Sequence, residues 1–161
     1  MMSESSQSGS RDRRQRNSRR HQARILAMQI RYEAEMTGHS TAEILVRTRN
    51  LGGTPDETLQ YASDLLTGIR ARVTDIHAEI EIAAPDYPVE GIAPIDRAIL
   101  EIALFETLFG DDVPPRAAVN EAVGIAKDYG GDASARFVNG VLGEIIDRRH
   151  PESGRKRGTS S

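Results

Sequence analysis

The stretch from Pro94 to Leu108 constrains the fold more than any other part of the sequence, because it is apolar around most of a helix. One helical stripe runs through Ile95, Ala98, Ile99, Ile102, Ala103 and Glu106, and a second row through Leu100, Leu104 and Leu108. Pro94 suits the first turn, where no amide donor is lost, and Asp96 places a negative charge near the helix N-terminus. Two apolar faces need partners on two sides, so we expect this helix to be the central post of the fold.

Apolar residues elsewhere also recur at helical spacing, which predicts an all-α protein. The remaining helices are expected over about residues 16–36, 40–49, 54–83, 115–130 and 132–148. Capping boxes at Ser40-Thr-Ala-Glu43 and Thr54-Pro-Asp-Glu57 mark two of the starts. Ala42, Leu45 and Val46 are the core candidates of the short second helix. Gly140 and Gly143 are expected to permit close packing of the last helix, which also buries Phe137.

The length of 161 residues fits one domain with ragged ends. Residues 1–15 are rich in Ser and Arg and have almost nothing to bury, so we expect a disordered N-terminal extension. Residues 16–149 should form the helical domain. Pro151 should stop the last helix, and residues 150–161 are expected to be a disordered basic tail.

The net charge of −3 hides a separation of charges along the chain. Residues 11–24 contain seven arginines and one acid, Asp12. A second basic group is formed by Arg148, Arg149, Arg155, Lys156 and Arg157. Arg16, Arg20, Arg24, Met28 and Tyr32 follow one another at four-residue spacing, which predicts a connected row down the first helix. Such basic ends, on a chain whose middle is acidic, indicate a polyanion partner.

Signals for other classes of protein are weak or absent from the sequence. No cysteine is present, no apolar run approaches the roughly 20 residues of a membrane span, and the N-terminus lacks a signal-peptide core. The four histidines are scattered without metal-ligand spacing, and no phosphate-cradling loop or paired carboxylates are found. We therefore expect a cytoplasmic protein that is not an enzyme and has no metal, cofactor or membrane contact.

Three motifs of the C-terminal half resemble the NusB family of transcription antitermination factors. They are Pro94-Ile-Asp-Arg-Ala-Ile-Leu-Glu-Ile-Ala-Leu-Phe-Glu106, Val119-Asn-Glu-Ala-Val-Gly-Ile-Ala-Lys127 with Tyr129-Gly130, and Phe137-Val-Asn-Gly-Val-Leu142. The basic first helix, with Arg20, Ala23, Arg24, Ala27, Gln29 and Tyr32, also fits that family. The resemblance covers roughly residues 16–146, and residues 38–90 match in helical layout only.

The resemblance implies an all-helical fold of two small bundles with about six to seven helices. It also implies binding of the boxA element in nascent ribosomal RNA transcripts, together with the ribosomal protein NusE and the transcription elongation complex. Asp96, which we expect at the exposed start of the central helix, falls where the family contacts NusE. The RNA-binding candidates are Arg13, Arg14, Arg16, Arg19, Arg20, Arg24, Tyr32 and Phe137.

The sequence is also compatible with other interpretations. The module could position RNA as a relative of the front ends of ribosomal-RNA methyltransferases, although 161 residues leave no room for a catalytic domain. A helix-turn-helix DNA regulator is a third interpretation, and a homodimer formed through an apolar or Arg-rich helix face is also open. Tyr32 and Phe137 each have an alternative as core residues, and Asp96 has one as a helix-start charge.

Overall fold

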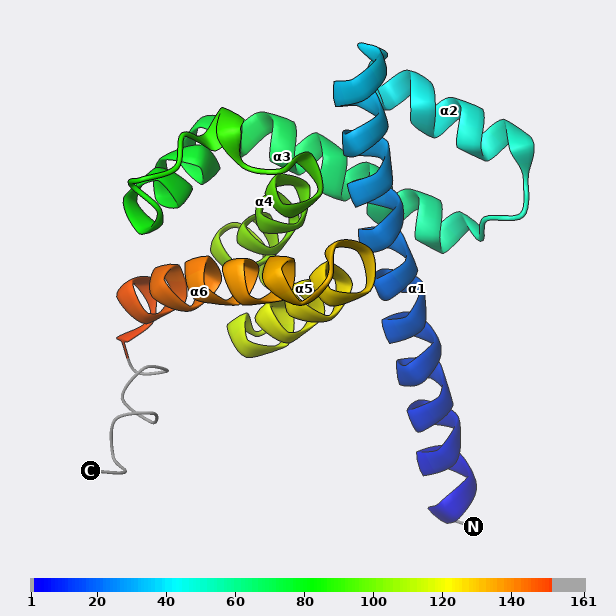
Figure 1. Ribbon diagram of the computed structural model, residues 1–161. Helices are drawn as coiled ribbons and strands as arrows, with labels where there is room; N and C mark the ends of the chain where they lie inside the picture. Colours follow the sequence, from blue (N-terminus) through cyan, green and yellow to red (C-terminus); the bar gives the residue numbers. More distant parts are fainter. Residues whose placement is uncertain (1, 152–161) are drawn as a thin grey trace. The chain divides into compact units, whose positions relative to one another are not determined.

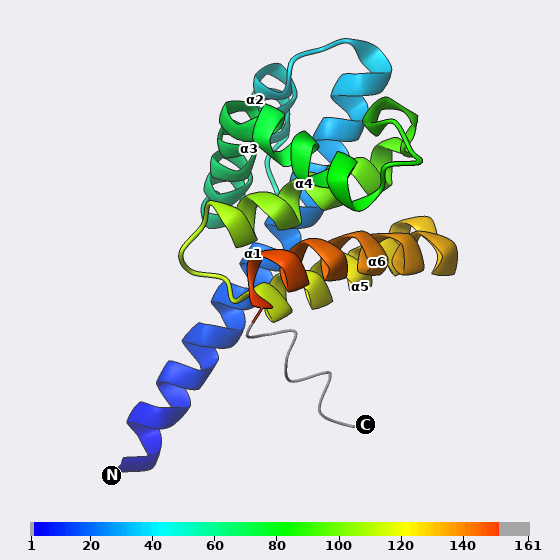
Figure 2. The ribbon, with the colours of Figure 1, turned by 90° about the vertical axis from the view of Figure 1, so that its left-hand side faces the viewer.

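The protein is described by a computed structural model that covers residues 2–151, with side chains from residue 7 onward. This part of the chain contains six α-helices, one 3-10 turn and no strand (Figures 1 and 2). The elements are α1 (Met2–Thr37), α2 (Thr41–Leu51), α3 (Asp56–Ala83), η1 (Val89–Gly91), α4 (Pro94–Leu108), α5 (Pro115–Gly130) and α6 (Asp132–Arg149). The all-α class predicted from the helical periodicity is confirmed.

The chain forms two compact units, Met1–Leu66 and Thr67–Ser161, and the boundary between them falls inside α3. The first unit contains α1, α2 and the beginning of α3. Gly38, with φ of 78°, ends α1, and the Ser40 side chain accepts a hydrogen bond from the Glu43 amide at the start of α2. The core of this unit consists of Ala23, Ala27, Met28, Ile30, Ile44, Leu45, Leu59, Ala62, Leu65 and Leu66.

The second unit is built around α4, which packs against α5 and α6 while those two helices lie side by side (Figure 1). Residues 98–104 of α4 are all buried, and Leu100 and Leu104 have no exposed surface. Positions around the whole helix are therefore covered, as expected for a central post. The predicted span of this helix, Pro94–Leu108, is confirmed, with Pro94 in the first turn.

Two buried carboxylates of this unit have basic partners. Glu101 of α4 is 1% exposed and lies 2.9 Å from Nε2 of His77 on α3. Glu79 of α3 accepts hydrogen bonds from both Arg148 and Arg149 at the end of α6. A carboxylate removed from water is costly unless it is paired, so these contacts allow the two acids to sit within an otherwise apolar bundle.

The N-terminus differs from the sequence-based expectation. Disorder was expected for residues 1–15, but α1 is continuous from Met2 to Thr37. Adding residues to an existing helix gains one hydrogen bond for each residue fixed, without a new nucleation step, so a polar segment can extend a helix that is packed further along. The expected disordered tail falls mainly on residues 152–161, which lie outside the described part of the chain.

The core of α2 also differs from the expectation. Ala42 and Val46 were predicted to be buried with Leu45, but both are exposed, and Ile44 is buried instead. Oγ1 of Thr48 donates to the Ile44 carbonyl on the same side of the helix. With only two buried residues, the apolar pattern of α2 is too short to show from the sequence which face of the helix packs inward.

Glycines in helices fall into two kinds. A Cβ added at Gly68 of α3 would lie 2.1 to 2.8 Å from ring atoms of Phe105 on α4, so the ring lies where a side chain would be. Gly140 and Gly143 of α6 have nothing within 4 Å of an added Cβ. The prediction that these two glycines permit close packing is therefore wrong within this chain, whereas Gly68 does have that role.

This contrast predicts opposite effects of two alanine substitutions. Gly140→Ala adds only helix propensity and should raise the free energy of unfolding by about 0.5–1 kcal/mol. Gly68→Ala should lower it by about 1 kcal/mol, because overpacking costs roughly 1–3 kcal/mol and outweighs the same propensity gain. Urea unfolding followed by circular dichroism measures both changes. Equal stability of the two variants would contradict the close packing of Gly68 against Phe105.

Candidate nucleic-acid interface

The arginines of α1 pass from an exposed to a packed environment along the helix. Every residue from Gln7 to Ser18 is exposed, which includes Arg11, Arg13, Arg14 and Arg16. Arg19 and Arg20 are half-buried, and Arg24 is only 6% exposed. Within the first unit, α2 lies beside the C-terminal half of α1, and no other helix of this unit runs along the N-terminal half (Figure 2). The part of α1 that is most basic is therefore open to solvent.

Tyr61, on the first part of α3, contacts the guanidinium groups of Arg20 and Arg24. The guanidinium carbon of Arg20 lies 5.1 Å from the centre of the Tyr61 ring, and that of Arg24 lies 5.8 Å from it. Cation–π contacts of this kind contribute about 0.5–1 kcal/mol at exposed sites and about 2 kcal/mol when desolvated. Tyr61 was not identified from the sequence, since neither its position nor its spacing shows that α3 brings it to α1.

The predicted connected row from Arg16 to Tyr32 is interrupted. Arg24 and Met28, at 6% and 1% exposure, lie in the packed interior, while Tyr32 emerges again at 40% exposure. The reason is helical geometry: each four-residue step turns by about 40° around the axis, so a row of five residues turns through roughly 160°. The prediction of one continuous surface is wrong, and two exposed patches lie on either side of the buried segment.

Phe137 on α6 belongs to an aromatic pair of the second unit. Its ring centre lies 5.8 Å from that of Tyr87, with the ring planes at 75°, which is an edge-to-face arrangement. Tyr87 is 57% exposed, and Phe137 is half-buried rather than buried as expected. Tyr87 was not singled out from the sequence, so the pairing of the two rings is a feature that the structure adds.

Asp96, expected at the exposed start of the central helix, is 9% exposed. Its carboxylate approaches the junction of α5 and α6: a Cβ added at Gly130 would lie 3.5 Å from Oδ1 of Asp96 and 2.4 Å from Oγ of Ser134. The next residue of the motif, Arg97, donates from its guanidinium to the Val89 carbonyl of η1 at 3.1 Å. The expected exposure of Asp96 is therefore wrong, because the α5–α6 junction covers its side chain.

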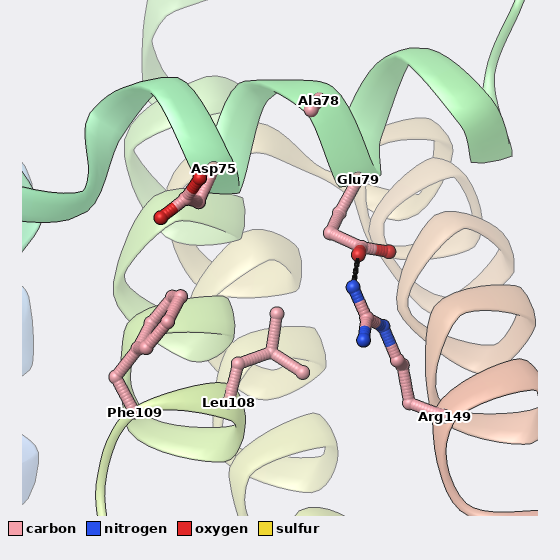
Figure 3. Close-up of a pocket in the computed structure, with 6 residues that line it drawn as sticks. All are labelled: Asp75, Ala78, Glu79, Leu108, Phe109 and Arg149. Atoms are coloured by element: carbon pink, nitrogen blue, oxygen red, sulfur yellow. Dashed lines mark hydrogen bonds and ion pairs between the residues drawn. The ribbon is translucent and has the colours of Figure 1, made fainter.

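A cleft of about 310 Å³ lies in the second unit at the ends of α4 and α6. It is lined by Asp75, Ala78, Glu79, Leu108, Phe109 and Arg149 (Figure 3). The Arg149 side chain reaches across the cleft to Glu79, as the dashed line in Figure 3 shows. Arg148 and Arg149 were counted from the sequence among charges for a polyanion, but both pair with Glu79. The other basic residues of that group lie outside the described part of the chain.

Two further properties concern the described residues alone. No three His, Cys, Asp or Glu side chains there come close enough together to hold a metal ion. None of the helices in residues 2–151 combines the length and the apolar character needed to cross a membrane.

Comparisons with known proteins identify the fold and the family. The model of the NusB family matches residues 21–147. The transcription antitermination protein NusB of Roseiflexus castenholzii is 39% identical over 136 residues, which cover 83% of this chain and 96% of the relative. The solved structure of T. maritima NusB superimposes with a TM-score of 0.71 at 27% identity, covering 80% of this chain and 90% of that one.

A further structure has the same fold at 22% identity, with a TM-score of 0.69 and coverage of 81% of this chain and 98% of that one. It is a complex of the antitermination factors NusB and NusE with double-stranded RNA. Two comparisons point to one family: the Roseiflexus relative, by its identity and coverage, and the family model, by its match over most of the helical core. The chain belongs to the NusB family.

Proposed function

We propose that this protein is a transcription antitermination factor that binds the boxA element of nascent ribosomal RNA together with NusE. Relatives that match over most of the chain carry the name transcription antitermination protein, and a protein of the same fold occurs in a complex with NusE and RNA. The observation that carries the proposal is the exposed arginine-rich surface of α1, which continues to the edge of the family-matched segment. In this proposal the protein acts in the cytoplasm, as part of the transcription elongation complex, and catalyses no reaction.

The RNA-contacting groups we propose lie in two places. On α1, the arginines contact phosphates, and the exposed ring of Tyr32 stacks on an unpaired base. The proposed phosphate contacts at boxA are Arg19 and Arg20. Arg13, Arg14 and Arg16, on the exposed first half of the helix, are proposed to attract the rest of the transcript. Arg24 is buried against Tyr61, which supports a positioning role for it rather than a phosphate contact. On the second unit, Phe137 and its partner Tyr87 offer a separate surface for base stacking.

The NusE contact we propose is Asp96. Its burial at 9% exposure leaves only a small part of the side chain accessible, so a Lys or Arg of the partner would have to approach past Gly130 and Ser134. A charge pair formed in such a confined place loses much of its water, and removing one member costs about 2–5 kcal/mol in complexes of this kind. The contact would thus be strong even though it involves one residue.

Replacing Arg19 and Arg20 by glutamine tests the RNA surface. The double variant removes two proposed phosphate contacts while keeping two good helix formers. For single-stranded RNA each contact contributes about 0.7 to the slope of log affinity against log salt concentration, so the slope for a boxA oligonucleotide should flatten by about 1.4. Fluorescence anisotropy titrations at several salt concentrations measure it.

The matched control is Arg49→Gln with Arg116→Gln, which changes the net charge equally at two exposed positions outside α1. It should leave the salt slope nearly unchanged. Tyr32→Ala is the companion variant, and loss of one base stack should weaken binding by about 1–3 kcal/mol at all salt concentrations. An unchanged slope in the Arg19 and Arg20 variant would show that boxA RNA binds elsewhere.

Replacing Asp96 by asparagine tests the NusE surface. The substitution keeps the shape of a buried side chain and removes only its charge, so the fold should survive, as a thermal unfolding curve would show. Binding of purified NusE should weaken at least tenfold, corresponding to about 1.4 kcal/mol, in calorimetric titrations. BoxA binding by the variant alone should stay within error of the original protein. Full NusE affinity in a folded Asp96→Asn variant would leave Asp96 as a structural residue only.

A further inference from the structure

The first half of α1 is a helical arm that precedes the family-matched segment. Residues 7–18 form this arm, whereas the family match begins at residue 21. All twelve residues of the arm are exposed and none has a large apolar side chain. The arm therefore cannot dock into an apolar groove, and its fixed direction comes from continuity with the packed half of the same helix. Its sequence suits only a polar, charged partner.

The charge of the arm defines that partner. Between residues 7 and 18 there are four arginines and one acid, Asp12. The other residues are neutral and polar or glycine, so no carboxylate other than Asp12 offsets the arginines within the arm. A polyanion is the complementary partner, because each guanidinium that replaces a condensed counterion on a phosphate adds to the affinity.

The arginines of the arm do not all share one face. At about 100° per residue, Arg13, Arg16 and Arg20 fall within roughly 60° of one another and form a stripe. This stripe covers about 10 Å along the axis, at 1.5 Å per residue, and leads from the arm to Arg20 beside Tyr61. Arg11 and Arg14 point more than about 120° away from the centre of the stripe. The helix therefore carries a basic face that includes Arg13 and Arg16. Arg11 and Arg14 carry the same total charge but lie away from that face.

We propose that the arm extends the RNA-binding surface, with Arg13 and Arg16 contacting phosphates of the transcript outside the boxA element. This inference rests on the proposed function, since it takes Arg20 to lie at the boxA site. A strand that leaves that site along the stripe meets the two arginines next. Because no arm residue offers a base-stacking ring or an apolar wedge, the contact is to the backbone and is independent of sequence.

The experiment compares a boxA oligonucleotide with the same RNA carrying a short single-stranded extension of arbitrary sequence at its 5′ or its 3′ end. The full-length protein should bind one of the extended RNAs roughly tenfold more tightly, with a salt slope steeper by about 1.4, as expected for two added phosphate contacts. Arg13→Gln with Arg16→Gln should abolish both gains and leave binding of the short RNA unchanged. Arg11→Gln with Arg14→Gln carries the same charge change and should retain most of the gain.

A second variant tests the geometry without changing any charge. Ser18→Pro should kink α1 between the arm and the packed half, because proline removes an internal hydrogen bond and clashes with the preceding turn. The extension should then add little affinity, although every arginine is still present. Circular dichroism and binding of the short RNA verify that the rest of the protein is intact.

The outcomes separate this inference from the proposed function. Failure of the unaltered protein to bind the short boxA RNA would overturn the proposed function and the inference with it. Normal binding of the short RNA, with no gain from either extension, would overturn the inference alone. Equal losses in the two double variants, or a full gain in Ser18→Pro, would show that the arm acts as a diffuse charge and not as an oriented helix face, which also overturns it.

Discussion

The burial of α4 on all sides is the constraint on which the second unit depends. Leu100 and Leu104 are fully covered, and so is nearly all of Glu101 between them. A helix with no solvent face needs neighbours around its whole circumference, which α5, α6 and the last part of α3 supply. The acid within this surface is tolerable because His77 reaches it, so the helix specifies a polar partner as well as apolar ones. The side chains of α4 thus determine which kinds of residue, apolar or polar, suit the facing positions of α3, α5 and α6.

Arginine has two physical roles in this protein that a count of charges does not distinguish. Arg24, Arg148 and Arg149 are held by Tyr61 or Glu79 and contribute to packing and internal pairing. Arg13 and Arg16 are exposed on a helix surrounded by water. Long side chains with planar heads serve both purposes, because the stem packs while the guanidinium stacks or bridges. Burial, rather than composition, decides which arginines remain available to a polyanion.

Local signals predicted the helices well. Pro94 and the Ser40 capping box act through neighbouring residues, and each marks a boundary that the structure has. The Tyr61 stack and the Gly68–Phe105 contact depend on which helices meet, and a single sequence does not contain that information. The Arg16-to-Tyr32 row was misjudged because the angular drift of four-residue spacing was underestimated. The part of α1 before residue 16 was missed, since its order comes from the helix it extends and not from its own residues.

The division of the chain inside α3 affects how this protein can be cut or recombined. Leu65 and Leu66 belong to the core of one unit, and Ile69 and Ile76, one to three turns further along, belong to that of the other. No loop separates them, so any truncation at the boundary would leave both fragments with a frayed half-helix and exposed leucine or isoleucine. The two units are therefore inseparable as folding modules, and shuffling either one into another protein would require the whole of α3 to travel with it.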